Sequence, residues 1–178
     1  MESASRRIFK SRTSSQHEMK ELLQALLVGE LLSPSNCLWI VSPWLSDIPL
    51  LDNRSGSFSS IEPTWGRREL HFVEVLKRLI AQGGHLAIVT RPDKHNQRFV
   101  SRLELAASEI GKDQNLKITE RQELHRKGLL GAHFYLSGSM NFTHNGVIKL
   151  DETVTLETDP SAIAQARIAF RDNYGGLE

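Results

Sequence analysis

The chain has 178 residues, of which 22 are Lys or Arg and 21 are Asp or Glu, so its formal net charge is +1. This length suits one ordinary domain that buries roughly two-thirds of its unfolded surface and needs no disulfide to fold. The near-neutral charge excludes a global electrostatic attraction to a polyanion, so any nucleic-acid contact must be local.

The one cysteine, Cys37, excludes a disulfide framework and a thiol-rich metal site within a single chain. No apolar run approaches the roughly 18 residues of a membrane span, and residues 1–15 lack the apolar core of a secretory signal. We therefore expect a soluble, cytoplasmic protein with no membrane partner.

The N-terminal region combines a basic stretch with a predicted helix. Residues 1–14 are rich in Arg and Lys and are expected to be disordered. Ser15 and Glu18 have the spacing of a capping box, and apolar residues then recur with helical period. This pattern predicts a helix over about 16–30.

A strand, a loop, a helix and a second strand are predicted next. The run 37–41 is short, apolar and rich in β-forming residues, which favours a buried strand. Residues 52–66 are rich in Ser, Gly, Asn and Pro and are expected to form an exposed loop, long enough to be functional or partly disordered. Apolar residues have helical period over 68–82, and the run 85–90 is the next buried strand.

The second half of the chain continues the alternation of helices and strands. A helix is expected over 96–110 and a last helix from Asp159 onward. The expected strands are 116–119, 125–130, 133–137 and 152–158. This order of elements predicts a single α/β domain over residues 1–178 with a mixed β-sheet.

Polar residues gather around the predicted hairpin at 125–137. In a strand, residues two apart project from the same face, so His125 and Lys127 would point together. Ser139 and Asn141 follow the second strand, whose end returns to the neighbourhood of the first strand's start. A lone histidine in a strand is more often structural than catalytic. The four residues together indicate a chemical site.

This pattern, His-x-Lys at 125–127 followed by Gly-Ser-x-Asn at 138–141, resembles the signature of the phospholipase D superfamily. The strand ending in Ile-Val-Ser-Pro at 40–43 also resembles the early strand of that fold, so the similarity spans most of the chain. The resemblance implies an α/β/α sandwich with a mixed sheet, as one half-size unit. Two features depart from the family: Ala132 stands where a structural Asp is usual, and the Gly-Ser pair arrives about one residue early.

A narrower resemblance concerns small bacterial members of the superfamily. The run His-x-Lys-Gly-Leu-Leu with Gly-Ser-Met-Asn-x-Thr is similar to members found beside DNA-modification and restriction functions. In particular, it is similar to the phospholipase-D-like component of clusters that place 7-deazaguanine derivatives in DNA. This similarity implies a DNA substrate and other proteins of a DNA-modification system as partners.

The family mechanism, as the resemblance implies it, is attack by one imidazole on phosphorus to give a phosphohistidine while a second imidazole protonates the leaving oxygen. The sequence contains one His-x-Lys, so a homodimer would set His125 of each chain against the other across one phosphate. Lys127, Ser139 and Asn141 would bind the non-bridging oxygens, so no metal and no other cofactor is implied.

Five more residues are candidates for roles around this phosphate, two of them as alternatives for the same role. Glu152, or Asp151 in its place, would hold the His125 ring in one tautomer. Arg91 could touch a nucleic-acid backbone and Trp44 could stack on a base, although a solvated surface position for the first and a core or dimer contact for the second are the competing interpretations. His144 could lie at the rim of the site.

Three functions are compatible with these residues. The first is a DNA phosphodiesterase, a nuclease of a modification or defence system. The second is a DNA-binding or assembly subunit that keeps the phosphate pocket without turnover, which Ala132 allows. The third, a lipid phosphodiesterase, is disfavoured because the sequence shows no amphipathic membrane-binding helix and no basic juxtamembrane cluster.

Overall fold

The computed structural model describes residues 5–10 and 18–176. In this part of the chain the strands are β1 (Ser5–Lys10), β2 (Cys37–Val41), β3 (Pro49–Asp52), β4 (Glu69–His71), β5 (His85–Thr90), β6 (Leu116–Glu120), β7 (Gly128–Leu130), β8 (Tyr135–Gly138) and β9 (Glu152–Glu157). The helices are α1 (Glu18–Leu32), α2 (Phe72–Ala81), α3 (Lys94–Glu109) and α4 (Pro160–Tyr174). Short 3-10 or π-helical turns lie at Pro63–Trp65, Asp113–Asn115 and Asn145–Lys149.

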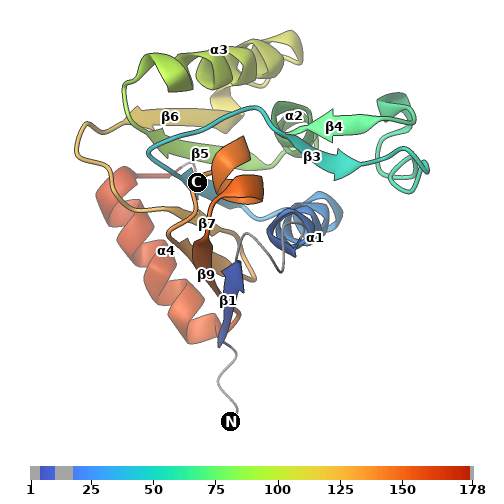
Figure 1. Ribbon diagram of the computed structural model, residues 1–178. Coiled ribbons are helices and arrows are strands. Elements are labelled where there is room, and N and C mark those ends of the chain that lie inside the picture. Colours follow the sequence, from blue (N-terminus) through green and yellow to red (C-terminus); the bar gives the residue numbers. More distant parts are fainter. Residues whose placement is uncertain (1–4, 11–17, 177–178) are drawn as a thin grey trace.

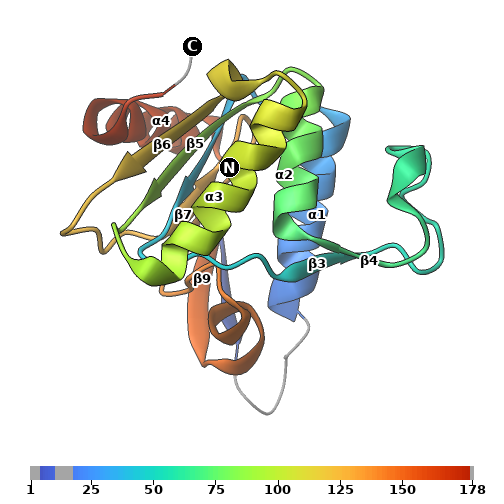
Figure 2. The ribbon, with the colours of Figure 1, turned by 90° about the horizontal axis from the view of Figure 1, so that it is seen from above.

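The described strands form one large and one small sheet. Seven of them make a mixed sheet in the order β1-β9-β8-β7-β2-β5-β6, and β3 pairs with β4 separately. β2, β5 and β6 are parallel, whereas β7, β8, β9 and β1 join by antiparallel pairing. Helices α1, α2 and α3 cover one face of the large sheet and α4 covers the other (Figure 1, Figure 2). The prediction of an α/β/α sandwich with a mixed sheet is confirmed.

The central strand β2 is apolar throughout because both of its faces are buried. Leu38 and Ile40 belong to the core between the sheet and α1, α2 and α3. Trp39 and Val41 belong to the core beneath α4. A strand covered on both faces has no position for a solvated side chain, which explains the continuous apolar run. Among the described helices, none has the length and apolar character needed to cross a bilayer.

One edge of the large sheet collects the strand ends that carry the candidate residues. β2, β5 and β6 end there, and the antiparallel β7 begins there, with Gly128 opposite Val41. β8 returns to the same edge, because Ser137 pairs with Gly128, and β9 starts beside it. We call this edge the candidate edge, since the strand ends there position the candidate residues considered below.

The N-terminal region and the loop at 52–66 differ in part from expectation. Residues 5–10 form the edge strand β1, paired with β9, where a disordered basic terminus was expected; the remainder of 1–14, and Ser15 of the capping box, lie outside the described residues. The segment 52–66 is a loop, yet Asn53 and Trp65 within it are buried. The Asn53 amide anchors both sides of this loop, donating to Gly66 O (2.6 Å) and accepting from Phe58 N (2.8 Å).

The helix predicted over 68–82 is wrong at its start. Residues 69–71 form β4, and α2 begins only at Phe72. The reason is a local cap: the Glu74 carboxylate accepts the His71 backbone N–H (2.9 Å), as in a capping box. The Asp47 carboxylate accepts the next free donor, Val73 N (2.9 Å), so the helix cannot extend toward Arg68.

Candidate active site

His125 and Lys127 lie in a loop before β7, and the prediction of a strand over 125–130 is wrong for its first half. Arg121 N donates to Thr90 O and Leu124 N to Arg121 O, so the chain turns at the end of β6. It then runs along the candidate edge and enters the sheet at Gly128. His125 is exposed and Lys127 is half-buried. The Lys127 ammonium donates to the His125 carbonyl oxygen (3.0 Å), which keeps the two residues together.

Arg91, which follows β5, holds the loop that carries His125. Its Nε donates to Leu124 O (2.9 Å) and its Nη2 lies 3.3 Å from His125 Nδ1. A guanidinium only donates hydrogen bonds, so Nδ1 is the acceptor in this contact. A neutral His125 ring in this geometry therefore carries its proton on Nε2.

Ser139 and Glu152 form a second cluster on the same edge. The Ser139 hydroxyl donates to Glu152 Oε2 and accepts from Thr153 N (3.0 Å), while Ser139 N donates to Thr153 O (2.9 Å). Glu152 is only 8% exposed. Within residues 5–10 and 18–176 no hydrogen bond joins Glu152 to His125. The contact to the imidazole that was expected of Glu152 is made by Arg91.

Gly138 permits this close approach of β8 to β9. Its φ of +154° lies at the margin of the region that L side chains rarely adopt, and a Cβ there would lie 2.1 Å from Thr153 O. Only glycine fits, so the Gly-Ser pair is a packing requirement that places the Ser139 hydroxyl at the edge.

Asn141 is held by Ser42, the residue that follows β2. From the sequence, Ser42 was predicted only to lie at the end of a strand. The Ser42 hydroxyl, fully buried, lies within hydrogen-bond distance of Asn141 Oδ1 (3.2 Å) and Trp44 O (2.8 Å). Because Oδ1 of Asn141 faces Ser42, the amide nitrogen of Asn141 points away from Ser42. This nitrogen can therefore donate hydrogen bonds to an anion. A Cβ on Gly146 would lie 2.3 Å from Asn141 O, so the π-helical turn also packs directly on this residue.

Of the three residues predicted to contact the substrate, Arg91 and Trp44 lie together and His144 lies apart from them. Arg91 lies over the Trp44 ring, with its guanidinium carbon 5.9 Å from the ring centroid. Trp44 is half-buried and meets the His95 ring edge to face at 5.8 Å. His144 is exposed at the start of the π-helical turn, and no hydrogen bond, ion pair or ring contact joins it to the other candidate residues among those described.

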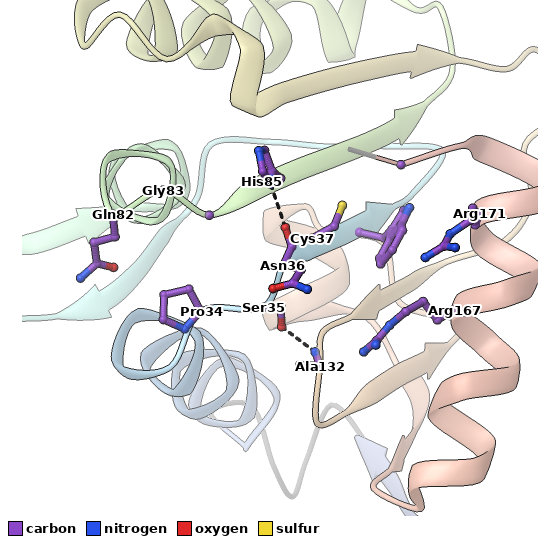
Figure 3. A pocket seen from close by; sticks show the side chains of 13 residues that line it. Pro34, Ser35, Asn36, Cys37, Gln82, Gly83, His85, Ala132, Arg167 and Arg171 are labelled. Carbon is purple, nitrogen blue, oxygen red and sulfur yellow. Dashed lines mark hydrogen bonds between the residues drawn. The ribbon is translucent and has the colours of Figure 1, made fainter. Parts of the chain in front are cut away.

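The candidate site is an open edge of the sheet rather than the cavity of about 660 Å³ at the opposite end. That cavity, shown in Figure 3, lies where β2 and β5 begin and is lined by residues such as Asn36, His85, Arg167 and Arg171. It contains none of the predicted site residues. Among the described residues no group of three or more His, Cys, Asp or Glu side chains has the arrangement of a metal site.

Ala132, at the position of the usual family Asp, also borders this cavity and is braced by other residues. Its backbone N–H donates to Ser35 Oγ (2.5 Å), and the Ser35 hydroxyl donates to Glu30 Oε1 (2.7 Å). The Glu30 carboxylate, 4% exposed, also accepts Ser35 N (2.9 Å). A buried carboxylate thus reaches the β7–β8 turn from α1 instead of from the turn itself.

The sequence matches no protein-family model and no curated protein, whereas solved structures match the fold over nearly the whole chain. NucT from Helicobacter pylori matches with a TM-score of 0.60 and 13% identity, over 97% of this chain and 97% of its own. Nuc from Salmonella typhimurium, described as a phospholipase D family member, matches with a TM-score of 0.61 and 12% identity, over 98% and 97%. The chain has the fold of the phospholipase D superfamily.

The phospholipase D fold also occurs inside a longer chain. Phosphatidylserine synthase from Haemophilus influenzae matches with a TM-score of 0.58 and 14% identity over 96% of this chain, but over only 38% of its own. This chain corresponds in extent to the whole of Nuc or NucT and to part of the synthase. At these identities the likeness concerns the fold alone.

Proposed function

We propose that this protein is a metal-independent phosphodiesterase that cleaves DNA through a phosphohistidine on His125, in an active site shared by two copies of the chain. The observation that carries the proposal is that the segments with His125, Lys127, Ser139 and Asn141 all lie at one edge of the sheet in a phospholipase D fold. An ammonium, an amide and a hydroxyl that converge on one imidazole can bind the non-bridging oxygens of a phosphodiester and offset the charge of its transition state.

The proposed reaction has two displacements at phosphorus. In the first, Nε2 of one His125 forms the N–P bond, the bond from phosphorus to the leaving oxygen breaks, and the partner's imidazolium ring gives that oxygen a proton and becomes neutral. In the second, water attacks phosphorus, the partner's imidazole takes the proton from water, and the N–P bond breaks. No proton or electron is left over, and both rings return to their starting state.

The contact between Arg91 and His125 has to open in both protomers for the proposed reaction. A ring with Nδ1 bound to Arg91 is neutral and carries its proton on Nε2. The acid needs protons on both ring nitrogens and the attacking ring needs a free Nε2 lone pair, so Arg91 has to release Nδ1 in each case. A phosphate oxygen is a stronger acceptor for the guanidinium than a neutral imidazole nitrogen. Substrate binding therefore favours this release.

The roles of the neighbouring residues follow from their hydrogen bonds. Glu152 acts through Ser139 by holding its hydroxyl, and Ser42 acts through Asn141 by holding its side-chain oxygen. Trp44 and His144 remain candidates for substrate contact. We assign the protein to a bacterial DNA-modification or restriction system, with other proteins of that system as partners, on the strength of the similarity around residues 125–143.

The decisive experiment incubates the purified protein with supercoiled plasmid in EDTA. We expect nicking by the wild type and by His133→Ala, which removes an exposed histidine from the β7–β8 turn, but not by His125→Ala. Acid quench of the wild type with end-labelled DNA should trap label on His125. A folded, dimeric wild type that leaves every phosphodiester intact without metal would contradict the proposal.

A second function, DNA binding without turnover, is favoured by one observation. The Arg91 contact leaves the His125 ring in the tautomer that cannot attack, and no carboxylate among the described residues binds its Nδ1. If the protein only binds DNA, His125→Ala will retain both DNA affinity and cellular function. Loss of cellular function with DNA affinity intact identifies the enzyme.

A further inference from the structure

A groove of about 450 Å³ lies beside the candidate edge, between the loop that follows β2 and the first half of α3. α3 starts four residues after β5 ends, so its first turn lies at the same end of the sheet as the site (Figure 2). A series of contacts connects the two. Arg91 touches His125 on one side and Trp44 on the other, and Trp44 packs on His95, which lines the groove.

Basic side chains line the α3 side of this groove at regular spacing. Lys94, Arg98 and Arg102 are four residues apart, so they share one helix face at steps of about 6 Å along the axis. All three are exposed. Cations at steps of this size can each meet a separate phosphate of one strand.

Two carboxylates near the groove are already engaged. Asp47, whose side chain is 6% exposed, pairs with Arg102 at 2.7 Å. Asp93 caps α3 by accepting His95 N (2.8 Å). Lys94 and Arg98, in contrast, form no ion pair within residues 5–10 and 18–176. The groove therefore has two uncompensated positive charges in a protein whose net charge is only +1.

The stability of α3 does not explain these cations. Lys94 occupies the first position of the helix, where the helix dipole disfavours positive charge, and the first turn has no acidic residue. Like charges four residues apart, as in Lys94 and Arg98, cost a further few tenths of a kcal/mol. An arrangement that is unfavourable for the helix is expected where an anion is bound.

We propose that this groove binds the phosphodiester backbone of the DNA on one side of the cleaved phosphate, with Lys94 and Arg98 each contacting one phosphate. The aromatic pair Trp44 and His95 lies between these cations and His125, where it can contact the intervening base. The inference rests on the proposed function for its substrate class, but it concerns binding and not chemistry.

The test measures DNA affinity in a background that cannot cleave. Fluorescence anisotropy with one labelled oligonucleotide, single-stranded in one arm and duplex in the other, is recorded over a NaCl series on His125→Ala. Lys94→Ala and Arg98→Ala are then added singly and together. The matched control is Lys112→Ala, which removes one positive charge beyond the opposite end of α3.

We expect each substitution in the groove to weaken binding. We also expect the plot of log K against log salt to become less steep, its negative slope shrinking by about 0.7 for the single strand or about 0.9 for the duplex. The double variant should lose roughly twice that slope, while the control keeps the slope of its parent. The arm with the larger loss identifies the form of DNA that lies in the groove. Thermal midpoints should not fall, because alanine replaces exposed cations at unfavourable positions.

Unchanged affinity and slope in the double variant, or an equal loss in Lys112→Ala, would overturn the inference. The outcome is independent of catalysis. If wild-type protein cleaves nothing but the groove variants lose affinity, the groove assignment stands and the phosphodiesterase proposal fails. If cleavage is present and the groove variants bind normally, the phosphodiesterase proposal stands and the groove assignment fails.

Discussion

Arg91 is the residue on which the position of His125 depends. Its guanidinium makes two contacts to the loop, through Nε to Leu124 O and through Nη2 to His125 Nδ1. A planar fork with several donors can hold two acceptors in fixed positions at once, whereas an ammonium is a single point of charge. The orientation of the imidazole is therefore expected to be sensitive to the shape of this side chain as well as to its charge.

Arg91→Lys should lower kcat roughly 10- to 100-fold with a smaller change in KM, because a displaced catalytic ring costs rate even when the substrate still binds. Nitrogen chemical shifts of His125 report which ring nitrogen carries the proton. We expect the Nε2-protonated form in the free wild type and a mixture in the variant.

The control is Arg121→Lys, since Arg121 follows the neighbouring strand β6 and binds Asn173 O instead of the His125 ring. Equal losses in the two variants would show that the effect of Arg91→Lys does not come from the contact with His125. An unchanged tautomer in Arg91→Lys would remove its assignment as the positioning residue.

Residue types and their spacing were enough to predict part of the candidate site. The remaining part consists of hydrogen bonds between residues far apart in the sequence, which only the structure shows. Ser139 and Asn141 were found because a Gly-Ser-x-Asn run at a strand end is a recognisable pattern. The pairing of Arg91 with His125 joins residues 34 positions apart, and that of Ser42 with Asn141 joins residues 99 apart. No local pattern encodes these distances. A serine directly after a buried strand was the one available signal for Ser42.

At the scale of elements, predictability followed burial. β2 and β5 were found because strands buried on both faces need continuous apolar runs. β3 and β4 were missed, since strands of four and three residues are too short to show a period. β1 was missed because its residues at 5–7 are exposed, so its sequence looks like a solvated terminus. Its existence depends on the open edge of β9.

The brace of the β7–β8 turn is an element-scale feature with a measurable energy. Ser35→Ala leaves the Ala132 N–H and one oxygen of the buried Glu30 carboxylate without this partner. Unsatisfied buried groups cost about 1–3 kcal/mol, so we expect the free energy of unfolding to fall by about 2 kcal/mol. Urea denaturation measures the loss. Ser33→Ala, at an exposed position two residues earlier, should lie within about 0.5 kcal/mol of wild type.

A wild-type value for Ser35→Ala would show that the turn does not depend on this brace. Conversely, a destabilised variant that still nicks plasmid at low temperature would show that bracing of the turn and catalysis are separate. This separation is expected, because Ala132 lies at the opposite end of β7 from His125.

The start of α2 predicts a pH dependence of stability. Hydrogen bonds from Arg68, followed by the backbone N–H of His71, hold the pKa of Glu74 below its usual value against the opposing effect of burial. A carboxylate with a lowered pKa in the folded state stabilises that state fully above its unfolded pKa. The contribution is lost as the pH falls through the lowered folded pKa.

We therefore expect Glu74→Gln to be destabilised by about 1 kcal/mol at pH 7, the usual size of a helix-cap contribution, and the difference from wild type to shrink as Glu74 protonates at low pH. Urea denaturation at pH 7 and at pH 3 measures both values. Glu104→Gln, at an exposed site on α3, should show no difference at either pH. A difference that grows toward pH 3 would contradict the assignment.

At the scale of the whole molecule, the proposed reaction requires a second copy of the chain at the candidate edge. One chain supplies one His125 on an open edge, and the proposed reaction needs two imidazoles on opposite sides of one phosphorus. A two-fold axis beside this edge would provide the second ring without a second motif in the sequence. A site shared by two chains predicts how activity depends on the proportion of active and inactive subunits in a mixture.

When both imidazoles serve one phosphate, a mixed dimer of wild type and His125→Ala is inactive. The two proteins are mixed at equal concentration and allowed to exchange subunits. The mixture should have about one quarter of the activity of wild-type protein at the same total protein concentration, because only that fraction of dimers has two intact rings. Activity should fall with the square of the wild-type fraction. Mixing with His133→Ala, altered outside the site, should leave activity unchanged. A linear fall to one half would mean that each protomer works with its own imidazole alone, which would remove the reason for a shared active site.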